Sequence, residues 1–317
     1  MPTPTLNEIR EAATRISPYI RYTPTLTSDT FNKIANANLF FKCENFQKTG
    51  SFKFRGACNA VFSLPEDKLK YGVATHSSGN HGAALALAAK LRGIPAYIVM
   101  PNNSPEVKKQ AVSHYGANIT FCEPTAASRE ATLEEVLEKT EATKIHPYEN
   151  EAVICGQGTA ALEFLIDENL DFDILVTPIG GGGLIAGTAI AAKSLASRVK
   201  IIGAEPETMN DAALSFQAKK ITPVTPKPSL CDGLSPTVGN ITFPLILKYV
   251  DHIFTASEQS ILDATKYFWE RMKIIVELSS AISLAVILEH PQIFKDKKIG
   301  VIVSGGNVDI KKIADLF

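Results

Sequence analysis

The sequence predicts an α/β protein with two lobes, each built on a parallel sheet. Short runs of β-branched residues alternate with Ala-, Leu- and Glu-rich stretches of helical length, which is the rhythm of α/β proteins. Units of strand, crossover helix and strand recur along the chain, and such units pair their strands in parallel. The 317 residues also exceed one ordinary domain, which favours two lobes.

The composition is that of a globular, enzyme-sized chain. Hydrophobic residues make up 45% and charged residues 21%, with 20 Gly and 18 Pro. The net charge is −1, from 32 Lys and Arg against 33 Asp and Glu, so no overall basic field attracts nucleic acid or an anionic membrane. We expect partners of neither kind.

The cysteines and the N-terminus indicate a reducing compartment. The 5 cysteines are scattered and none forms a C-x-x-C pair, which indicates neither a disulfide framework nor a zinc site. The first residues lack the basic start and the apolar segment of a signal peptide, and no apolar run of about 18 residues occurs. We therefore expect a cytoplasmic protein.

The first series of elements covers the N-terminal half. A strand over 72–75 leads into a glycine-containing turn and then a helix that stops near Arg92, where Gly93 suits a C-cap. Two similar units follow, with strands over 96–100 and 118–122 and helices over 105–115 and 126–143. We expect residues 72–149 to form a small domain.

The second series covers the rest of the chain and, with residues 1–71, forms the expected large domain over 150–317. A Pro-rich stretch over 222–228 interrupts it as an extended surface connection. The predicted elements are helix 159–169, strand 173–177, helix 184–196, strand 199–204, strand 252–255, helices 258–272 and 279–289, and strand 299–303.

Four consecutive glycines separate a predicted strand from a helix. They are Gly180, Gly181, Gly182 and Gly183. Backbone N–H groups without side chains, together with the positive end of a helix, hold a phosphate well, although a tight turn would also use glycine. A rival interpretation is that Gly181 to Ala186 fits G-x-G-x-x-G/A, with Glu205 as the ribose-binding acid of an NAD-dependent oxidoreductase.

Three further motifs carry groups suited to chemistry. Lys53 stands between Phe52 and Phe54, where desolvation would favour a neutral, nucleophilic amine, although most lysines are simply exposed. The segment 77–82, S-S-G-N-H-G, places polar side chains at a strand-to-helix turn, and 304–307, S-G-G-N, follows a strand. A capped helix start and a polar turn are the alternatives for these two segments.

Together, these four motifs resemble fold type II pyridoxal-phosphate (PLP) enzymes, specifically the serine racemase and serine/threonine dehydratase family. They occur in the family's order and span essentially the whole chain. The resemblance implies two lobes with the cofactor between them. It implies that Lys53 forms the Schiff base with PLP, beside Phe52, that Asn80 binds the phenolic oxygen, that the four glycines hold the phosphate, and that Ser304 meets the pyridine nitrogen.

Within this family, Ser78 bears on the reaction. The biosynthetic threonine dehydratases usually carry alanine there, whereas racemases carry serine. Racemisation needs proton donors on both faces of a planar carbanion, with Lys53 on one face and Ser78 on the other, while elimination of the β-hydroxyl needs one base. Since 3-hydroxyaspartate dehydratases also tend to carry this serine, it leaves the substrate open.

An acidic segment predicts a metal site. The carboxylates of Glu205 and Asp211 flank the main-chain carbonyl of Met209, and these are hard oxygen ligands for Mg²⁺, or Ca²⁺ or Mn²⁺. The matching segment of the racemase branch binds such an ion. A solvated acidic turn is the alternative, because two carboxylates do not complete an octahedron without waters.

One segment departs from the family pattern: Glu277, Leu278 and Ser279 stand where relatives commonly have Glu-Pro followed by Ser or Thr, which bears on substrate orientation.

We expect racemisation or dehydration of an amino-acid substrate, first L-serine and then L-threonine, with 3-hydroxyaspartate dehydration as the alternative. A non-catalytic ligand-binding protein on the same scaffold is a third hypothesis. The resemblance implies a homodimer.

Overall fold

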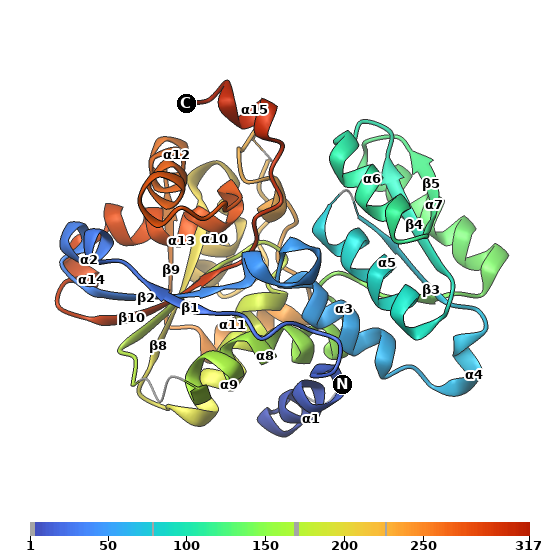
Figure 1. Ribbon diagram of the computed structural model, residues 1–317, viewed down its shortest axis with the longest axis horizontal. Coiled ribbons are helices and arrows are strands. Elements are labelled where there is room, and N and C mark those ends of the chain that lie inside the picture. The colour runs from blue at the N-terminus through green and yellow to red at the C-terminus, as the bar shows by residue number, and fades with distance from the viewer. Residues whose placement is uncertain (1–3, 78, 168–170, 226) are drawn as a thin grey trace.

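The chain folds into two lobes, each organised around one sheet (Figure 1). The computed structural model describes residues 4–77, 79–167, 171–225 and 227–317. Helix α3 (Lys53–Phe62) lies between the lobes and packs against a helix of each, α8 (Glu151–Asp167) and α5 (Asn80–Arg92) (Figure 1). The residue that begins α3 is therefore fixed relative to both lobes.

The larger lobe contains a sheet of six strands. The strand order is β1 (Thr25–Thr27), β2 (Asn38–Cys43), β10 (Lys298–Val303), β7 (Ile174–Pro178), β8 (Lys200–Pro206) and β9 (His252–Ala256). Every neighbouring pair is parallel except β1 with β2, whose antiparallel pairing the sequence did not indicate. The strands β7 and β10 are buried almost throughout, as parallel strands covered on both faces are.

Helices cover both faces of this sheet (Figure 1). One face packs against α2 (Asp29–Ala35), α12 (Glu258–Tyr267) and α13 (Leu278–Glu289). The other packs against α8, α9 (Gly183–Leu195), α11 (Thr242–Tyr249) and, through α8 and α9, α1 (Leu6–Ile16). The lobe also contains α10 (Asp211–Ala218), α14 (Pro291–Phe294), α15 (Ile310–Ala314) and the short helical turns η1 (Glu44–Phe46), η2 (Lys48–Gly50), η3 (Glu207–Met209) and η4 (Asp232–Leu234).

The smaller lobe contains a fully parallel sheet of four strands. Its order is β5 (Asn118–Cys122), β4 (Ala96–Pro101), β3 (Val73–His76) and β6 (Thr143–Lys144). Its helices are α4 (Glu66–Leu69), α5, α6 (Glu106–His114) and α7 (Ala126–Thr140). These strands all lie within 72–149, although the expected domain boundaries themselves stay a prediction.

Two helix boundaries differ from the sequence-based expectation. The helix expected over 126–143 ends at Thr140, because Glu141 adopts a left-handed conformation and Thr143 pairs with Val73 in the sheet. The helix expected from 159 begins at Glu151, and its predicted last residues lie outside the described residues. Gly156 and Gly158 weaken the helical signal, but α8 needs them where it meets α3 and α9, since a Cβ at Gly158 would lie 2.8 Å from the carbonyl oxygen of Gly187.

A third helix boundary, in the C-terminal half of the chain, also differs from the sequence-based expectation. The helix expected over 258–272 is regular only to Tyr267 and continues as a π-helical turn, η5 (Phe268–Met272), which Lys273 ends in a left-handed conformation. The other predicted strands and helices lie within a few residues of their expected positions, whereas elements such as α1, α2, α11, β1 and β2 were not predicted. No helix among the described residues is both long and apolar enough to cross a membrane.

Candidate active site

The pocket that contains the candidate residues lies where strands of both sheets end. The small lobe contributes the loop after β3, and the large lobe contributes the loops after β7 and β10. Helix α3 supplies the residues Phe52 and Lys53 at its start. Because parallel strands present their carboxyl ends at one edge, loops that are distant in sequence meet here.

Lys53 is held in a poorly hydrated position. Its Nζ donates a hydrogen bond to the carbonyl oxygen of Pro147 at 3.3 Å and lies 5.1 Å from the ring centre of Phe52. Burial lowers the pKa of Lys53 to about 8, although the Glu277 carboxylate acts in the opposite direction. The second expected ring does not contribute, because Phe54 points into the hydrophobic core of the small lobe.

The glycine loop forms a cradle that side chains would fill. Gly182 has a φ of +91°, a conformation that favours glycine, and α9 starts at Gly183. A Cβ at Gly181 would overlap the ring of Tyr148, and one at Gly180 would lie 3.0 Å from the Cα of Leu234. The loop and the helix start therefore suit an anionic group such as the phosphate of PLP.

Asn80 connects the two lobes at the floor of the pocket. Its Nδ2 donates to both carboxylate oxygens of Glu277, at 2.9 and 3.1 Å, and its Oδ1 accepts from Nδ2 of Asn307 at 3.0 Å. Burial, followed by the nearby Asp232, raises the pKa of Glu277 to about 7. Ser304 is buried beside these residues, and its carbonyl oxygen accepts from the backbone N–H of Phe52 at 2.9 Å.

Two histidines beside Lys53 are neutral at neutral pH. Nε2 of His81 lies 3.1 Å from the carbonyl oxygen of Ile145, and Nδ1 of His146 accepts from the backbone N–H of Glu149 at 2.9 Å. Burial lowers the pKa of His81 to about 3 and that of His146 to about 4. The two imidazoles therefore add no positive charge around the Lys53 amine.

The predicted metal-binding carboxylates lie apart from this pocket. Glu205 is almost fully buried. Its two carboxylate oxygens accept hydrogen bonds from the backbone N–H groups of Ala212 and Ala213, both at 2.9 Å. Asp211 accepts from the N–H of Val238 at 2.9 Å. Burial, with a smaller contribution from Asp211, raises the pKa of Glu205 to about 8.

Two neighbouring buried carboxylates fit a divalent cation, which would offset their repulsion. The described residues contain no group of three or more His, Cys, Asp or Glu side chains placed for a metal. A cation here would thus also need backbone carbonyl oxygens and water. This agrees with the expected participation of the Met209 carbonyl, which stays a prediction.

The comparisons with known proteins decide the family. The family model described as pyridoxal-phosphate dependent enzyme matches residues 16–305. The chain belongs to this family.

Individual relatives place it near one branch of these PLP-dependent enzymes. It is 49% identical to a serine racemase of Dictyostelium discoideum, over 100% of this chain and 98% of that one, and 47% identical to a β-hydroxyaspartate dehydratase of Paracoccus denitrificans, over 98% of each. The structure of maize serine racemase superposes with a TM-score of 0.96 at 43% identity, covering 99% of this chain and 97% of that one. The predicted fold class is confirmed.

The family also excludes the dinucleotide interpretation of the glycine loop. The strand, loop and helix around Gly181 to Ala186 are present, but membership of the PLP-dependent enzymes makes the NAD-dependent oxidoreductase hypothesis wrong. Glu205 is also engaged by the start of α10 and almost fully buried, so it is not presented to a ribose.

The structure brings most predicted site residues of this PLP-dependent enzyme into one pocket. Its lining includes Phe52, Lys53, Asn80, Gly180, Gly181, Gly182, Gly183 and Ser304. Their individual roles stay predictions. Ser78 lies outside the described residues, next to Ser77, which lines the pocket.

Several pocket residues were not predicted from the sequence. Arg129 and Tyr148 line the pocket from segments in which no motif was noticed, and Glu277 was noted only as a departure from the family pattern. Arg129 lies in the first turn of α7, a helix that packs on the small-lobe sheet but whose sequence around Arg129 resembles any exposed helix. The isolated Tyr148 offers no signal, because its value to the pocket depends on the glycines opposite it.

The raised pKa of Glu277 predicts a pH-dependent stability. A carboxyl that holds its proton more tightly when folded contributes stability at low pH, and this contribution is lost as pH rises from its ordinary value near 4.5 through about 7. Glu277→Gln cannot titrate, so the wild type should lose up to about 3 kcal/mol more than this variant between pH 5 and pH 8. Urea unfolding at several pH values measures the difference.

The matched control is Glu66→Gln, because the Glu66 side chain is 91% exposed. Its stability should follow that of the wild type with pH. Parallel pH curves for the wild type and Glu277→Gln would contradict the assignment of this pH dependence to Glu277.

Proposed function

We propose that the protein is a PLP-dependent serine racemase that also eliminates water from serine. The observation that carries this proposal is the partly desolvated amine of Lys53, which faces the same pocket as the glycine cradle and Asn80. Relatives named serine racemase at 45–49% identity support serine as the first substrate. The homodimer and the cytoplasmic location expected from the sequence stay predictions.

The residues of the pocket divide the work of holding the cofactor and moving protons. Bound PLP supplies an electron sink for the charge left on the substrate Cα when its proton leaves. The backbone N–H groups of Gly180 to Gly183 would hold the phosphate, Asn80 would hydrogen-bond the phenolic oxygen, and the Ser304 hydroxyl would meet the pyridine nitrogen. The ring of Phe52 shields one side of the site from water.

The lowered pKa of Lys53 makes its amine available as a base at the substrate Cα. With a pKa of about 8, a useful fraction of the amine is neutral near physiological pH and can remove the Cα proton. For racemisation, the Ser78 hydroxyl returns a proton to the opposite face. For elimination, the Cβ–O bond breaks instead, and the hydroxyl takes up a proton and leaves as water.

The first experiment measures both products from one incubation. Purified protein with PLP, Mg²⁺ and L-serine should form D-serine, quantified by chiral chromatography, together with the keto acid and ammonia. Ser78→Ala should lose D-serine by about 100-fold or more and keep keto acid, because elimination needs only Lys53. Lys53→Ala should form neither. Absence of both products with the wild-type holoenzyme would contradict the proposal.

A second candidate substrate is 3-hydroxyaspartate, which one arginine favours. Arg129 lines the pocket, and among the described residues its buried Nε has no hydrogen-bond partner. The nearby cation Lys108 is already paired with Asp232. A substrate with a second carboxylate would supply the missing acceptor, and β-hydroxyaspartate dehydratase is among the relatives.

Arg129→Gln separates the two substrates. If Arg129 holds the second carboxylate, kcat/KM for 3-hydroxyaspartate should fall by about 30-fold, the value of a charge-assisted hydrogen bond, while that for serine changes little. Steady-state keto-acid formation from each substrate measures this ratio. Equal losses for both substrates would show that Arg129 serves a group they share, and would count against 3-hydroxyaspartate as the favoured substrate. Lys139→Gln, on the exposed part of α7, is the control.

We also propose that Glu205, Asp211 and the Met209 carbonyl hold a divalent cation. The cation competes with the proton on Glu205, whose pKa is about 8, so its binding should strengthen as pH rises. Mg²⁺ should therefore raise the thermal unfolding temperature more at pH 8.5 than at pH 6, and Glu205→Gln should remove this increase. An equal effect of Mg²⁺ on the variant would place the cation elsewhere.

A further inference from the structure

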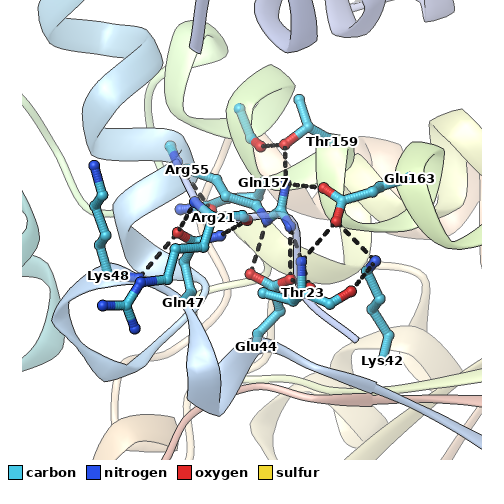
Figure 2. Close-up of polar contacts among 12 residues, drawn as sticks. Arg21, Thr23, Lys42, Glu44, Gln47, Lys48, Arg55, Gln157, Thr159 and Glu163 are labelled. Atoms are coloured by element: carbon cyan, nitrogen blue, oxygen red, sulfur yellow. Dashed lines mark hydrogen bonds and ion pairs between the residues drawn. The ribbon is translucent and has the colours of Figure 1, made fainter. Parts of the chain in front are cut away.

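A buried ionic cluster lies next to the start of α3 (Figure 2). It is defined by Lys42, Glu44, Arg55 and Glu163, two cations and two carboxylates. The first three side chains are at most 1% exposed, and that of Glu163 is 11% exposed. Because apolar residues often replace a buried ionic cluster without loss of stability, stability alone does not account for its presence.

Arg55 is the centre of the cluster. Its Nε and Nη2 bind the two carboxylate oxygens of Glu44 at 2.7 and 2.8 Å, and its Nη1 binds Oε2 of Glu163 at 2.7 Å (Figure 2). A planar guanidinium held on both edges by two carboxylates has one orientation only. The backbone that carries Arg55 is therefore fixed against η1, which directly follows β2, and against α8.

This backbone is the first turn of α3, which also carries Lys53. Two residues apart on a helix, Lys53 and Arg55 point in nearly opposite directions, the first into the pocket and the second into the cluster. Phe52, the residue before the helix, provides no side-chain cap. Instead, Gln157 accepts from the N–H of Gly56 at 3.1 Å, so tertiary contacts hold this helix start.

The N-terminal segment closes the cluster from the other side. Thr23 donates its N–H to Glu163 at 2.9 Å and its hydroxyl to Glu44 at 2.6 Å, and its carbonyl oxygen accepts from Lys42 at 2.8 Å (Figure 2). Gln47 exchanges two hydrogen bonds with the backbone of Arg21, at 2.8 and 2.7 Å. Both contacts restrain the loop over 44–50 that leads into Lys53.

We propose that Arg55 and Glu44 are positioning residues that hold the first turn of α3 so that the Lys53 amine meets the aldehyde of PLP. The inference rests on the proposed function of Lys53. Arg55 is not among the residues that line the pocket and acts only through the backbone. A small displacement of this turn moves Nζ away from the reacting carbon while leaving the glycine cradle, on a different element, intact.

The test separates cofactor binding from covalent attachment. The full-length protein, stripped of PLP, is mixed with increasing PLP while visible absorbance follows attachment, in which the Lys53 nitrogen adds to the aldehyde carbon, water leaves and a C=N bond forms. The PLP concentration at which the observed attachment rate is half-maximal gives the dissociation constant for PLP. The maximal observed rate gives the rate constant of attachment. Arg55→Lys keeps the charge but cannot form the two-pronged contact, so the rate should fall on the order of tenfold with an unchanged dissociation constant.

The matched control is Lys42→Met, which breaks an ion pair of the same cluster without touching α3. It should lower the unfolding temperature and leave the attachment rate unchanged. Attachment by Arg55→Lys at the wild-type rate, or equal slowing by Lys42→Met, would overturn the proposal. If Arg55→Lys does not fold, Thr23→Val, which removes the hydroxyl contacts to Glu44 and to Nη2 of Arg55, should slow attachment, and an unchanged rate would overturn it. A wild type that attaches PLP but leaves serine unchanged would count against the proposed function alone.

Discussion

The site depends on one constraint: a lysine amine must stay partly without water while it faces a cleft between two lobes. Burial lowers the pKa of Lys53 to about 8, and the two histidines beside it remain neutral. Such an amine is available both as a nucleophile and as a base. Holding it there requires a helix that belongs to both lobes, and α3 packs against α8 and α5 for that reason.

The remaining architecture places the partners of this amine. Parallel sheets bring the loops after β3, β7 and β10 to one cleft, so a glycine cradle, an amide and a hydroxyl converge on it from distant parts of the chain. Asn80 and Glu277 join the lobes across the floor of the cleft. The same contacts that shape the pocket thus also fix how the lobes meet.

Much of this arrangement could be predicted from local sequence. The prediction failed where tertiary contacts determine the structure. The alternation of strands and helices, the glycine loop and the Gly93 cap depend on local backbone chemistry and were predictable. The early start of α8 was not, because Gly156 and Gly158 are explained only by the helices packed against them. Arg129, Tyr148 and the partners of Arg55 could not be predicted for the same reason, since the role of each depends on a residue far away in sequence.

The proposed mechanism requires that Lys53 carries the cofactor. Borohydride reduction of the wild-type holoenzyme, followed by proteolysis and mass spectrometry of the modified peptides, tests it most directly, because reduction makes the linkage permanent. We expect PLP on the peptide that contains Lys53. Modification of another pocket lysine, such as Lys108, with Lys53 unmodified, would contradict the assignment on which the proposed mechanism rests.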